Sequence, residues 1–310
     1  MHAALVTSYD APPRYTEIEE PTASARGEAV VEVLAAALHP RVRSQADGSH
    51  YTSTDELPLV PGIDAVVRDD RGRLRYALLD DTALGTMAER TVIELDRSVV
   101  LPRSVDPVAI AAAMNAVMSS WVALRRRIRF RRGQRVLILG ATGSSGRMAI
   151  QVAKRLGARE VVAAGRNIAK LAPLGALGAD RTLLYDDLTP AADVDVVLDY
   201  VWGPVTAAAM VPLLTARRDR SQPLAWVQIG SMAGLESSIP SAALRSARLQ
   251  LVGSGIGSVP GREYKSELPA IAKAVAAGAF DVRPRAVPLT DVERTWTESL
   301  GSEERIVFVP

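Results

Sequence analysis

The segment VLILGATGSSGRMAIQVAKRLGA, residues 136–158, constrains the fold of this chain more than any other part of its 310 residues. It predicts a short buried strand at 136–139, a turn with three glycines and a helix at 147–156. The same alternation continues along the chain: further strands are predicted at 161–164, 182–185, 194–198, 225–229 and 249–252, and further helices at 168–177, 205–215 and 241–248. Apolar strands separated by helices are typical of a parallel, doubly wound sheet, so the predicted fold class is α/β.

The first third of the chain has a different pattern. The segment EAVVEVLAAAL, 28–38, begins with the alternation of a half-buried strand, and proline and glycine punctuate LPLVPGIDAVV at 57–67. These features predict a β-rich domain. Near the C-terminus a helix at about 267–277 and a closing strand, RIVFVP, follow the α/β part. The β-rich domain is therefore expected to recruit the C-terminal part, which makes the α/β domain an insertion.

The glycine turn has the composition of a phosphate site. Gly140, Gly143 and Gly146 form the pattern GxxGxxG between strand and helix. In such turns one glycine allows a sharp bend, one lets backbone N–H groups approach a pyrophosphate, and one lets helix and strand pack closely. Ser144 and Ser145 lie in the same turn and are candidate cofactor-binding residues. The alternative interpretation is a strand–helix turn that binds no ligand.

The end of the next strand indicates which dinucleotide is bound. It reads Gly165-Arg166-Asn167, about 20 residues after Gly146. NAD sites present an acidic residue to the ribose 2′-hydroxyl at this distance, whereas an arginine accommodates the 2′-phosphate of NADP. The acid is missing here, and Lys170 follows Arg166 by one helical turn. The pattern favours NADP(H); the alternative is that Arg166 is an exposed loop charge.

Five segments together resemble the medium-chain dehydrogenase/reductase superfamily, in its zinc-independent quinone oxidoreductase branch. They run in the family's order: LPLVPGIDAVV at 57–67, GTMAERTVI at 85–93, the glycine-turn segment at 136–158, VQIGSMAG at 227–234 and LQLVGSGIGSVP at 249–260. The resemblance implies a GroES-like substrate domain at 1–118 with 257–310, and a Rossmann dinucleotide-binding domain at 119–256. It also implies NADPH as hydride donor and a homodimer that pairs through the edge strand LQLVGSGIG.

The resemblance adds Tyr185, in TLLYDD, as a contact to the 2′-phosphate, although a packing role at the strand end is equally open. The nicotinamide is expected near the carboxyl ends of the strands, at the point where the strand order reverses. Candidates at these ends are Gly230, Ser231 and Gly253, together with the turn at 200–203. Asn115, in the connecting helix, is a further candidate. Glycines after strands are also ordinary turn residues.

The stretch LHPRVRSQADGSHYTS, 38–53, holds the candidate catalytic residues. The resemblance implies a Gly-x-Tyr here whose tyrosine faces the substrate, and this chain has Tyr51 one residue further on. Tyr51 would donate a hydrogen bond to a substrate carbonyl oxygen. His39 titrates near neutrality and could shuttle a proton, although the sequence supplies no partner for it. Arg41 and Arg43 suggest an anionic or bulkier substrate, and each of these residues is also compatible with a loop or surface role.

The available chemistry follows from what the chain lacks. It has no cysteine, and Pro61-Gly62-Ile63-Asp64 stands where zinc enzymes of the superfamily carry a His-Glu pair, so we expect no metal site. Hydride transfer without zinc favours substrates that are already electrophilic, such as quinones and α,β-unsaturated carbonyls. The predicted function is an NADPH-dependent, zinc-independent oxidoreductase of such small molecules. The alternative is an NADPH-binding sensor or structural protein with little turnover, a hypothesis motivated by the altered 38–53 stretch.

Charge and hydropathy exclude other classes. A formal net charge of +2 argues against a wholesale nucleic-acid or anionic-membrane binder. The arginine-rich run at 125–132 is interpreted as a solvated helix end. The apolar segment at 107–124 is predicted to be a buried helix rather than a membrane span. The opening residues show no secretory signal, so a cytoplasmic location is expected.

Overall fold

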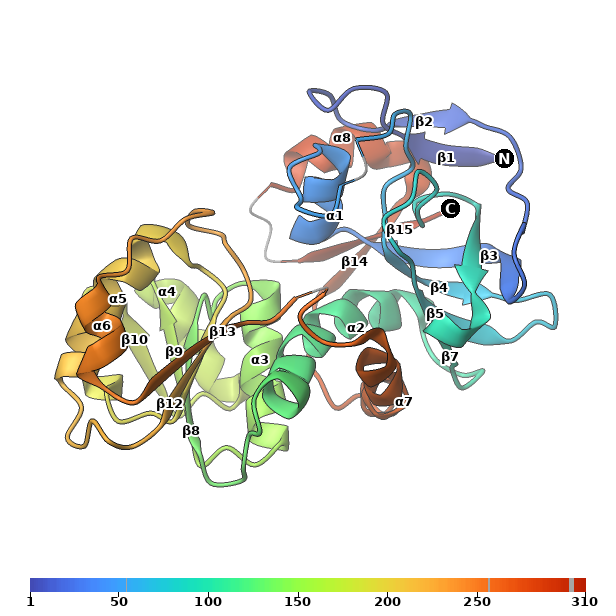
Figure 1. Cartoon of the computed structure of the whole chain (residues 1–310). Coiled ribbons are helices and arrows are strands. Elements are labelled where there is room, and N and C mark those ends of the chain that lie inside the picture. The colour runs from blue at the N-terminus through green and yellow to red at the C-terminus, as the bar shows by residue number, and fades with distance from the viewer. Residues whose placement is uncertain (54, 256, 301–303) are drawn as a thin grey trace. The chain divides into compact units, whose positions relative to one another are not determined.

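The structure, a computed structural model, describes residues 1–53, 55–255, 257–300 and 304–310. The chain divides into two compact units (Figure 1). The β-rich unit is Met1–Asn115 with Lys265–Pro310, and the α/β unit is Ala116–Tyr264. The predicted domain boundary at residue 256 lies outside the described residues.

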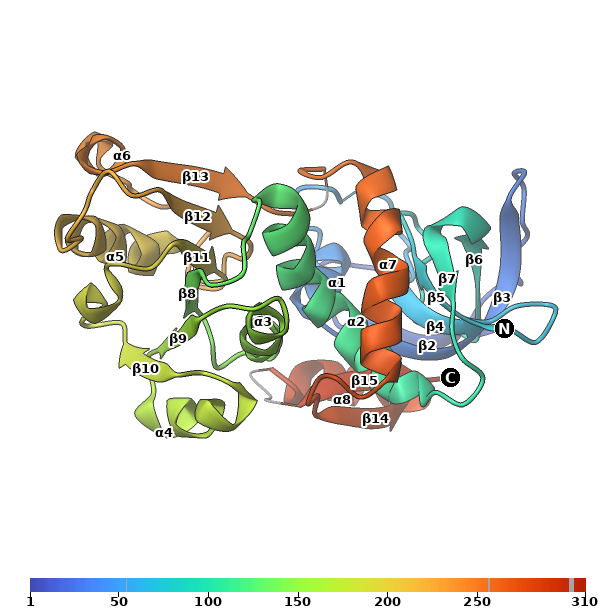
Figure 2. The same cartoon turned by 90° about the horizontal axis from the view of Figure 1, so that it is seen from below.

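The α/β unit is built on a parallel sheet of six strands in the order β10-β9-β8-β11-β12-β13. Figure 2 shows the strands in this order, with helices on both sides of the sheet. The strands are β8 (Arg135–Leu139), β9 (Glu160–Gly165), β10 (Arg181–Leu184), β11 (Val196–Asp199), β12 (Leu224–Gln228) and β13 (Leu249–Gly253). This arrangement confirms the predicted parallel, doubly wound sheet.

The helices of this unit lie close to their predicted positions. They are α3 (Ser144–Arg155), α4 (Ile168–Leu171) with a 3-10 turn at Ala172–Leu177, α5 (Gly203–Thr215) and α6 (Ser241–Ser246). Helix α3 begins three residues earlier than predicted, because the glycine turn passes into it without a spacer. The apolar residues of β8, β9, β11 and β12 pack with α5 into one buried cluster that includes the fully buried Trp226.

The β-rich unit has a seven-stranded sheet in the order β14-β15-β3-β4-β5-β7, with β6 paired to β3, and a two-stranded sheet of β1 and β2. The strands are β1 (His2–Leu5), β2 (Arg14–Glu17), β3 (Glu28–Ala37), β4 (Asp64–Arg68), β5 (Leu74–Leu78), β6 (Arg90–Glu94), β7 (Ser98–Val100), β14 (Pro284–Pro288) and β15 (Arg305–Val309). The closing strand β15 runs antiparallel to β3, with Val307 opposite Ala37. Residues from both ends of the chain, including Val33 and Phe308, share one apolar core.

The remaining α-helices of the described residues are α1 (Pro40–Ala46), α2 (Pro107–Val122), α7 (Gly261–Ala276) and α8 (Val292–Glu298). Helix α2 continues into a π-helical turn at Ala123–Arg127. Within the described residues, Pro107–Arg127 is long and apolar enough to cross a membrane by length and composition, and 67% of its most apolar window is buried in the protein. This is weak evidence for a membrane span, because the buried core helix of a soluble protein passes the same test.

Candidate functional site

The carboxyl ends of the parallel strands meet along one edge of the α/β unit's sheet. The last residue of β8, Leu139, is in register with Ala164 of β9 and with Asp199 of β11. Asp199 is in turn in register with Gln228 of β12. The residues after these strands therefore leave the sheet at the same edge, and the strand order reverses between β8 and β11. In open α/β sheets, ligands bind at such a reversal.

The three glycines after β8 are used in different ways. Gly140 has a φ of +84°, which residues with a side chain rarely adopt. A Cβ at Gly146 would lie 2.2 Å from the carbonyl oxygen of Gly140 and 2.6 Å from the Cα of Ala141. Gly143 is exposed, and a Cβ there would meet only the Gly140 oxygen, at 3.6 Å. The backbone requires glycine at two positions, whereas the space beside Gly143 is open to a ligand.

The N-terminus of α3 lies directly behind this open space. Gly143 is the N-cap and has no side chain that could accept from the first N–H groups of the helix. Ser144 and Ser145 are half-buried in the first turn. The first N–H groups of a helix have no intrahelical acceptor and carry partial positive charge, which favours an anion. The turn therefore has the donors that a pyrophosphate needs, together with room for it.

Tyr185 contacts this turn directly, across 45 residues of sequence. The Gly140 N–H donates to the Tyr185 hydroxyl oxygen at 2.8 Å. The described residues provide no acceptor for the hydroxyl's own proton, so a ligand oxygen could take it. Burial raises the pKa of Tyr185, and the Arg166 guanidinium opposes that rise. The structure thus brings Tyr185 and Arg166 together beside the glycine turn.

The two cations after β9 are both at the surface. Arg166 and Lys170 are exposed, and Asn167 between them accepts from the Ala169 N–H at 2.9 Å, which caps α4. This cap orders the start of the helix that carries Lys170. Exposed positive side chains at the end of the second strand suit a second phosphate group.

The turn after β11 is organised by Asp199, a residue that sequence reasoning missed. Its carboxylate is fully buried and accepts from the Val201 and Trp202 N–H groups, both at 2.9 Å. It also accepts from the Thr206 hydroxyl at 2.6 Å and the Trp226 indole N–H at 2.9 Å. Four donors offset the cost of burying a carboxyl group, and a fully satisfied network of this kind rigidifies the groups around it. The only signal in the sequence was an acid at the end of an apolar strand.

Tyr200, in the same turn, is buried against α2. Its hydroxyl lies 3.1 Å from that of Ser119. Burial raises the pKa of Tyr200 to about 12, although the hydrogen bond with Ser119 opposes the rise. The phenol is therefore neutral at physiological pH, and it anchors the turn after β11 to α2 within the α/β unit.

The remaining predicted cofactor residues are more scattered. A Cβ at Gly230 would lie 2.8 Å from the carbonyl oxygen of Tyr200, so close backbone packing explains this glycine. Ser231 and Gly253 are exposed at the ends of β12 and β13, and the Gly253 carbonyl accepts from the Arg127 guanidinium. Asn115 is half-buried on α2 and belongs to the β-rich unit.

In the β-rich unit the structure supplies the partner of His39 that the sequence did not reveal. The His39 Nε2 lies 2.9 Å from Asp64 Oδ1, and the Tyr76 hydroxyl donates to Asp64 Oδ2 at 2.8 Å. All three residues are buried. Burial lowers the pKa of His39, while the Asp64 carboxylate opposes this. At neutral pH the imidazole is therefore neutral, with its proton on Nε2, and Nδ1 has no partner among the described residues.

Arg305 completes the surroundings of this pair. It is 5% exposed, and one of its N–H groups donates to the Leu38 carbonyl at 3.3 Å. Burial lowers the pKa of Arg305 to about 10, and the Asp64 carboxylate opposes that shift. Asp64 thus faces a buried cation as well as two buried donors, which makes it the central charge of this cluster.

The other residues predicted in the 38–53 stretch differ in their surroundings. Tyr51 is 72% exposed, and its ring lies 4.1 Å from that of His50, measured between centroids. Arg41 forms an ion pair with Asp81 and donates to Thr52 at 2.7 Å. Within the protein, the positive charge of Arg41 is therefore balanced by a carboxylate.

Arg43 ties two helices of the β-rich unit together. It donates to the Trp296 carbonyl at 2.7 Å and to the Ser299 hydroxyl at 2.8 Å. Its guanidinium also lies 5.1 Å from the centroid of the Trp296 ring. These contacts join α1 to α8, so Arg43 has a structural role whether or not a substrate also approaches it.

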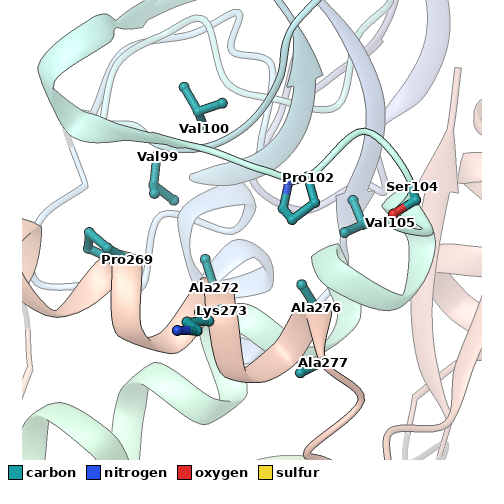
Figure 3. A pocket seen from close by; sticks show the side chains of 10 residues that line it. All are labelled: Val99, Val100, Pro102, Ser104, Val105, Pro269, Ala272, Lys273, Ala276 and Ala277. Carbon is teal, nitrogen blue, oxygen red and sulfur yellow. The ribbon is translucent and has the colours of Figure 1, made fainter.

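A surface groove of about 460 Å³ lies in the β-rich unit between α7 and the segment that joins β7 to α2. Figure 3 shows its lining, which is Val99, Val100, Pro102, Ser104, Val105, Pro269, Ala272, Lys273, Ala276 and Ala277. Reaction sites combine apolar walls with several convergent polar groups. Here Ser104 and Lys273 are the polar members, so we do not place the reaction in this groove.

Comparisons with known proteins bear directly on this geometry. No family model matches the chain. The probable NADPH-dependent quinone reductase of Emericella nidulans is 30% identical, and the match covers 100% of both chains. The chain belongs to the medium-chain dehydrogenase/reductase superfamily, in its quinone oxidoreductase branch. The resemblance seen in the five sequence segments is thereby confirmed.

Two further likenesses agree with this assignment. The NADPH-dependent alkenal/one oxidoreductase of Arabidopsis thaliana is 30% identical over a region that covers 53% of this chain and 48% of that protein. The quinone oxidoreductase of Thermus thermophilus, which has been crystallised with NADPH, superposes with a TM-score of 0.83. That alignment covers 100% of both chains at 24% identity, so it supports the fold alone.

Proposed function

We propose that this protein is an oxidoreductase that uses NADPH to reduce quinones or α,β-unsaturated carbonyl compounds. The full-length relative from Emericella nidulans carries the name of a probable NADPH-dependent quinone reductase, and the partial relative from Arabidopsis thaliana that of an alkenal/one oxidoreductase. The observation that carries the proposal in this chain is the glycine turn, with Tyr185 bonded to Gly140 and with Arg166 beside it.

The residues present fit NADPH. The open space at Gly143 and the first N–H groups of α3, including Ser144 and Ser145, would hold the pyrophosphate. Arg166 and Lys170 are positive, exposed and at the end of the second strand, where they would hold the 2′-phosphate. The Tyr185 hydroxyl has a proton to donate to the same group. One charge-assisted hydrogen bond contributes about 1.5–3 kcal/mol, which corresponds to roughly a tenfold to hundredfold preference for NADPH over NADH.

The remaining cofactor residues are proposed for the nicotinamide half. Gly230 and Ser231 follow β12, and Gly253 ends β13, so all three belong to the carboxyl edge that also carries the glycine turn. Asn115 is proposed for the same half of the cofactor because of its place on the connecting helix α2. Bound NADPH supplies a hydride, and the protein residues orient it and exclude water.

His39 and Tyr51 are proposed for the substrate. The Asp64 carboxylate holds the His39 ring through Nε2, so that Nδ1 is the nitrogen left to exchange a proton with a substrate oxygen. Because the pKa of His39 is lowered, its protonated form is a minority at neutral pH. Activity that uses His39 as an acid therefore increases as the pH falls toward that pKa. The exposed Tyr51 hydroxyl would donate a hydrogen bond to the substrate carbonyl oxygen.

The proposal also covers the absence of a catalytic metal, the oligomeric state and the cellular location of the protein. We propose that the reaction proceeds without zinc, because the chain contains no cysteine and because His39 and Asp64 are already paired with each other. The β-rich unit acts as a GroES-like substrate domain and the α/β unit as the dinucleotide domain. The protein is a homodimer paired through β13, an edge strand whose unpaired backbone groups need cover. Its location is the cytoplasm.

The decisive experiment titrates the purified protein with NADPH and with NADH, and then screens quinones and enones for NADPH oxidation. The proposal expects NADPH to bind at least about tenfold more tightly and at least one substrate class to be turned over. Tight NADPH binding without turnover across the panel would favour a cofactor-binding sensor instead. If neither nucleotide bound, the glycine turn would be a scaffold element and the proposal would be wrong.

A further inference from the structure

Trp202 has a backbone conformation that a bulky side chain opposes. Its φ is +53° and its ψ is −156°, in a region that glycine adopts readily. Gly203, the next residue, also has a positive φ, of +63°. Positive φ at a bulky residue persists only where the surrounding structure enforces it, and such residues concentrate at functional sites.

The surrounding structure does enforce this conformation. The buried Asp199 carboxylate accepts from the Trp202 N–H and is itself held by Thr206 and Trp226. A Cβ at Gly203 would lie 2.6 Å from the carbonyl oxygen of Ala233, so the loop after β12 presses on the turn from another side. The turn cannot relax without breaking this buried network. Glycine at position 202 would satisfy the same backbone without strain.

Among the described residues, the indole makes no polar or ring–ring contact that would offset the strain. Trp202 is half-buried, and it is not among the residues of the α/β unit that pack against the apolar core cluster. Among the described residues its indole N–H has no hydrogen-bond partner, and its ring has no aromatic or cation–π partner. Trp226, by contrast, is fully buried in that cluster and donates to Asp199.

The position of Trp202 in the fold indicates which half of a dinucleotide it would adjoin. Trp202 follows β11, the neighbour of β8, at the reversal of strand order. A Cβ at Gly140 would lie 3.1 Å from the Tyr200 Cβ and 3.2 Å from Val201 Cγ1, so this turn adjoins the glycine turn. Arg166 lies on the opposite flank of the glycine turn, after β9. A dinucleotide whose adenosine half lies toward β9 therefore has its other half near β11.

We propose that Trp202 is a cofactor-binding residue whose indole packs against the nicotinamide half of NADPH. This inference rests on the proposed function, because it needs NADPH as the ligand. A planar aromatic ring held by a rigid backbone loses little freedom when it stacks on a heterocycle. The strain at Trp202 thus keeps the indole at the strand edge, where a side chain on a relaxed backbone could turn away.

The test compares whole NADPH with 2′,5′-ADP, which carries the adenosine half and the 2′-phosphate alone. Trp202→Gly is expected to weaken NADPH binding about fivefold to a hundredfold, the range for aromatic stacking on heterocyclic bases, and to leave 2′,5′-ADP binding unchanged. Trp202→Phe keeps a ring and should retain most NADPH affinity. Trp296→Phe, in the β-rich unit, is the matched control and should change neither affinity.

Thermal unfolding measures the effect of the backbone strain on stability, separately from the effect of the indole on binding. Trp202→Gly is expected to unfold at a higher temperature than Trp202→Ala, because alanine keeps the Cβ that opposes a positive φ. The inference is wrong if Trp202→Gly binds NADPH like the wild type, or if it loses NADPH and 2′,5′-ADP affinity to the same extent. If the wild type binds neither nucleotide, the proposed function fails as well. If the wild type binds NADPH and Trp202→Gly binds it equally well, only the role of Trp202 is overturned.

Discussion

Replacing Asp64 with alanine is predicted to destabilise the β-rich unit strongly. Asp64 is 1% exposed and accepts from the His39 ring at 2.9 Å and from the Tyr76 hydroxyl at 2.8 Å. Alanine removes both acceptor oxygens at once. His39 and Tyr76 are 3% and 0% exposed, so water cannot take the place of the carboxylate without entering the core.

The magnitude follows from these contacts. A buried polar group left without a partner costs about 1–3 kcal/mol, so the two donors together cost about 2–6 kcal/mol. Arg305 also loses the carboxylate that offsets the cost of burying its charge. We therefore expect the loss of unfolding free energy to lie in the upper half of that range. Because whole domains are stable by only about 5–15 kcal/mol, this loss is a large share of the unit's stability.

The assay is urea unfolding of wild type, Asp64→Ala and a surface control, Asp80→Ala. Asp80 is paired with Arg97, and its side chain is 59% exposed, so its removal should cost less than about 1 kcal/mol. Asp64→Asn should fall between the two, because its amide keeps the volume and one acceptor oxygen. A loss for Asp64→Ala no larger than that for Asp80→Ala would refute the view that this carboxylate organises the buried cluster.

Three further predictions concern the cofactor turn and pH. Arg166→Ala should weaken NADPH binding about tenfold to a hundredfold and leave NADH binding unchanged. Tyr185→Phe leaves the Gly140 N–H without its acceptor and also removes the proposed donor to the 2′-phosphate, so it should weaken both nucleotides, and NADPH more than NADH. Parallel titrations of the two nucleotides measure both effects. Gly146→Ala should lower the unfolding temperature, because its Cβ would lie 2.2 Å from the Gly140 carbonyl oxygen. A Cβ at Gly143 would lie 3.6 Å from the same oxygen, so Gly143→Ala should keep the unfolding temperature and lose cofactor affinity. The free energy of unfolding should fall as the pH drops below about 6.5, by at most about 1.4 kcal/mol per pH unit for His39. The reason is that His39 binds a proton in the unfolded chain at a pH where the buried imidazole stays neutral. Urea titrations from pH 7.5 to 5 measure this slope, and a free energy that does not change with pH would contradict the prediction.

The sequence predicted the conformation of the glycine turn, because the signals that form it are local. A strand, a glycine that bends the chain and a glycine that lets a helix pack are all encoded within about a dozen residues, and both Gly140 and Gly146 have the geometry that requires glycine. Arg166 was predictable for the same reason, since it follows the next strand directly. The start of α3 differed by three residues, because helix ends depend on capping more than on periodicity.

The partners of the candidate residues were not predictable in this way. His39 and Asp64 are 25 residues apart and belong to a helix cap and a strand, so no periodicity relates them. The bond between Gly140 and Tyr185 joins positions 45 residues apart. Arg41, interpreted as a candidate for an anionic substrate, proved to be paired with Asp81, a residue 40 positions away.

Sequence alone determined the class of sheet, the place of the glycine turn and the charge after the second strand, because apolar periodicity, glycine spacing and charge are properties of neighbouring residues. Tertiary structure decided which polar groups are paired, which are buried and which remain for a ligand. Asp199 looks like any acid at a strand end until the fold surrounds it with four donors, and Trp202 looks like any loop aromatic until its φ is known. The physical reason is that hydrogen-bond satisfaction, desolvation and backbone strain depend on atoms brought together from distant parts of the chain.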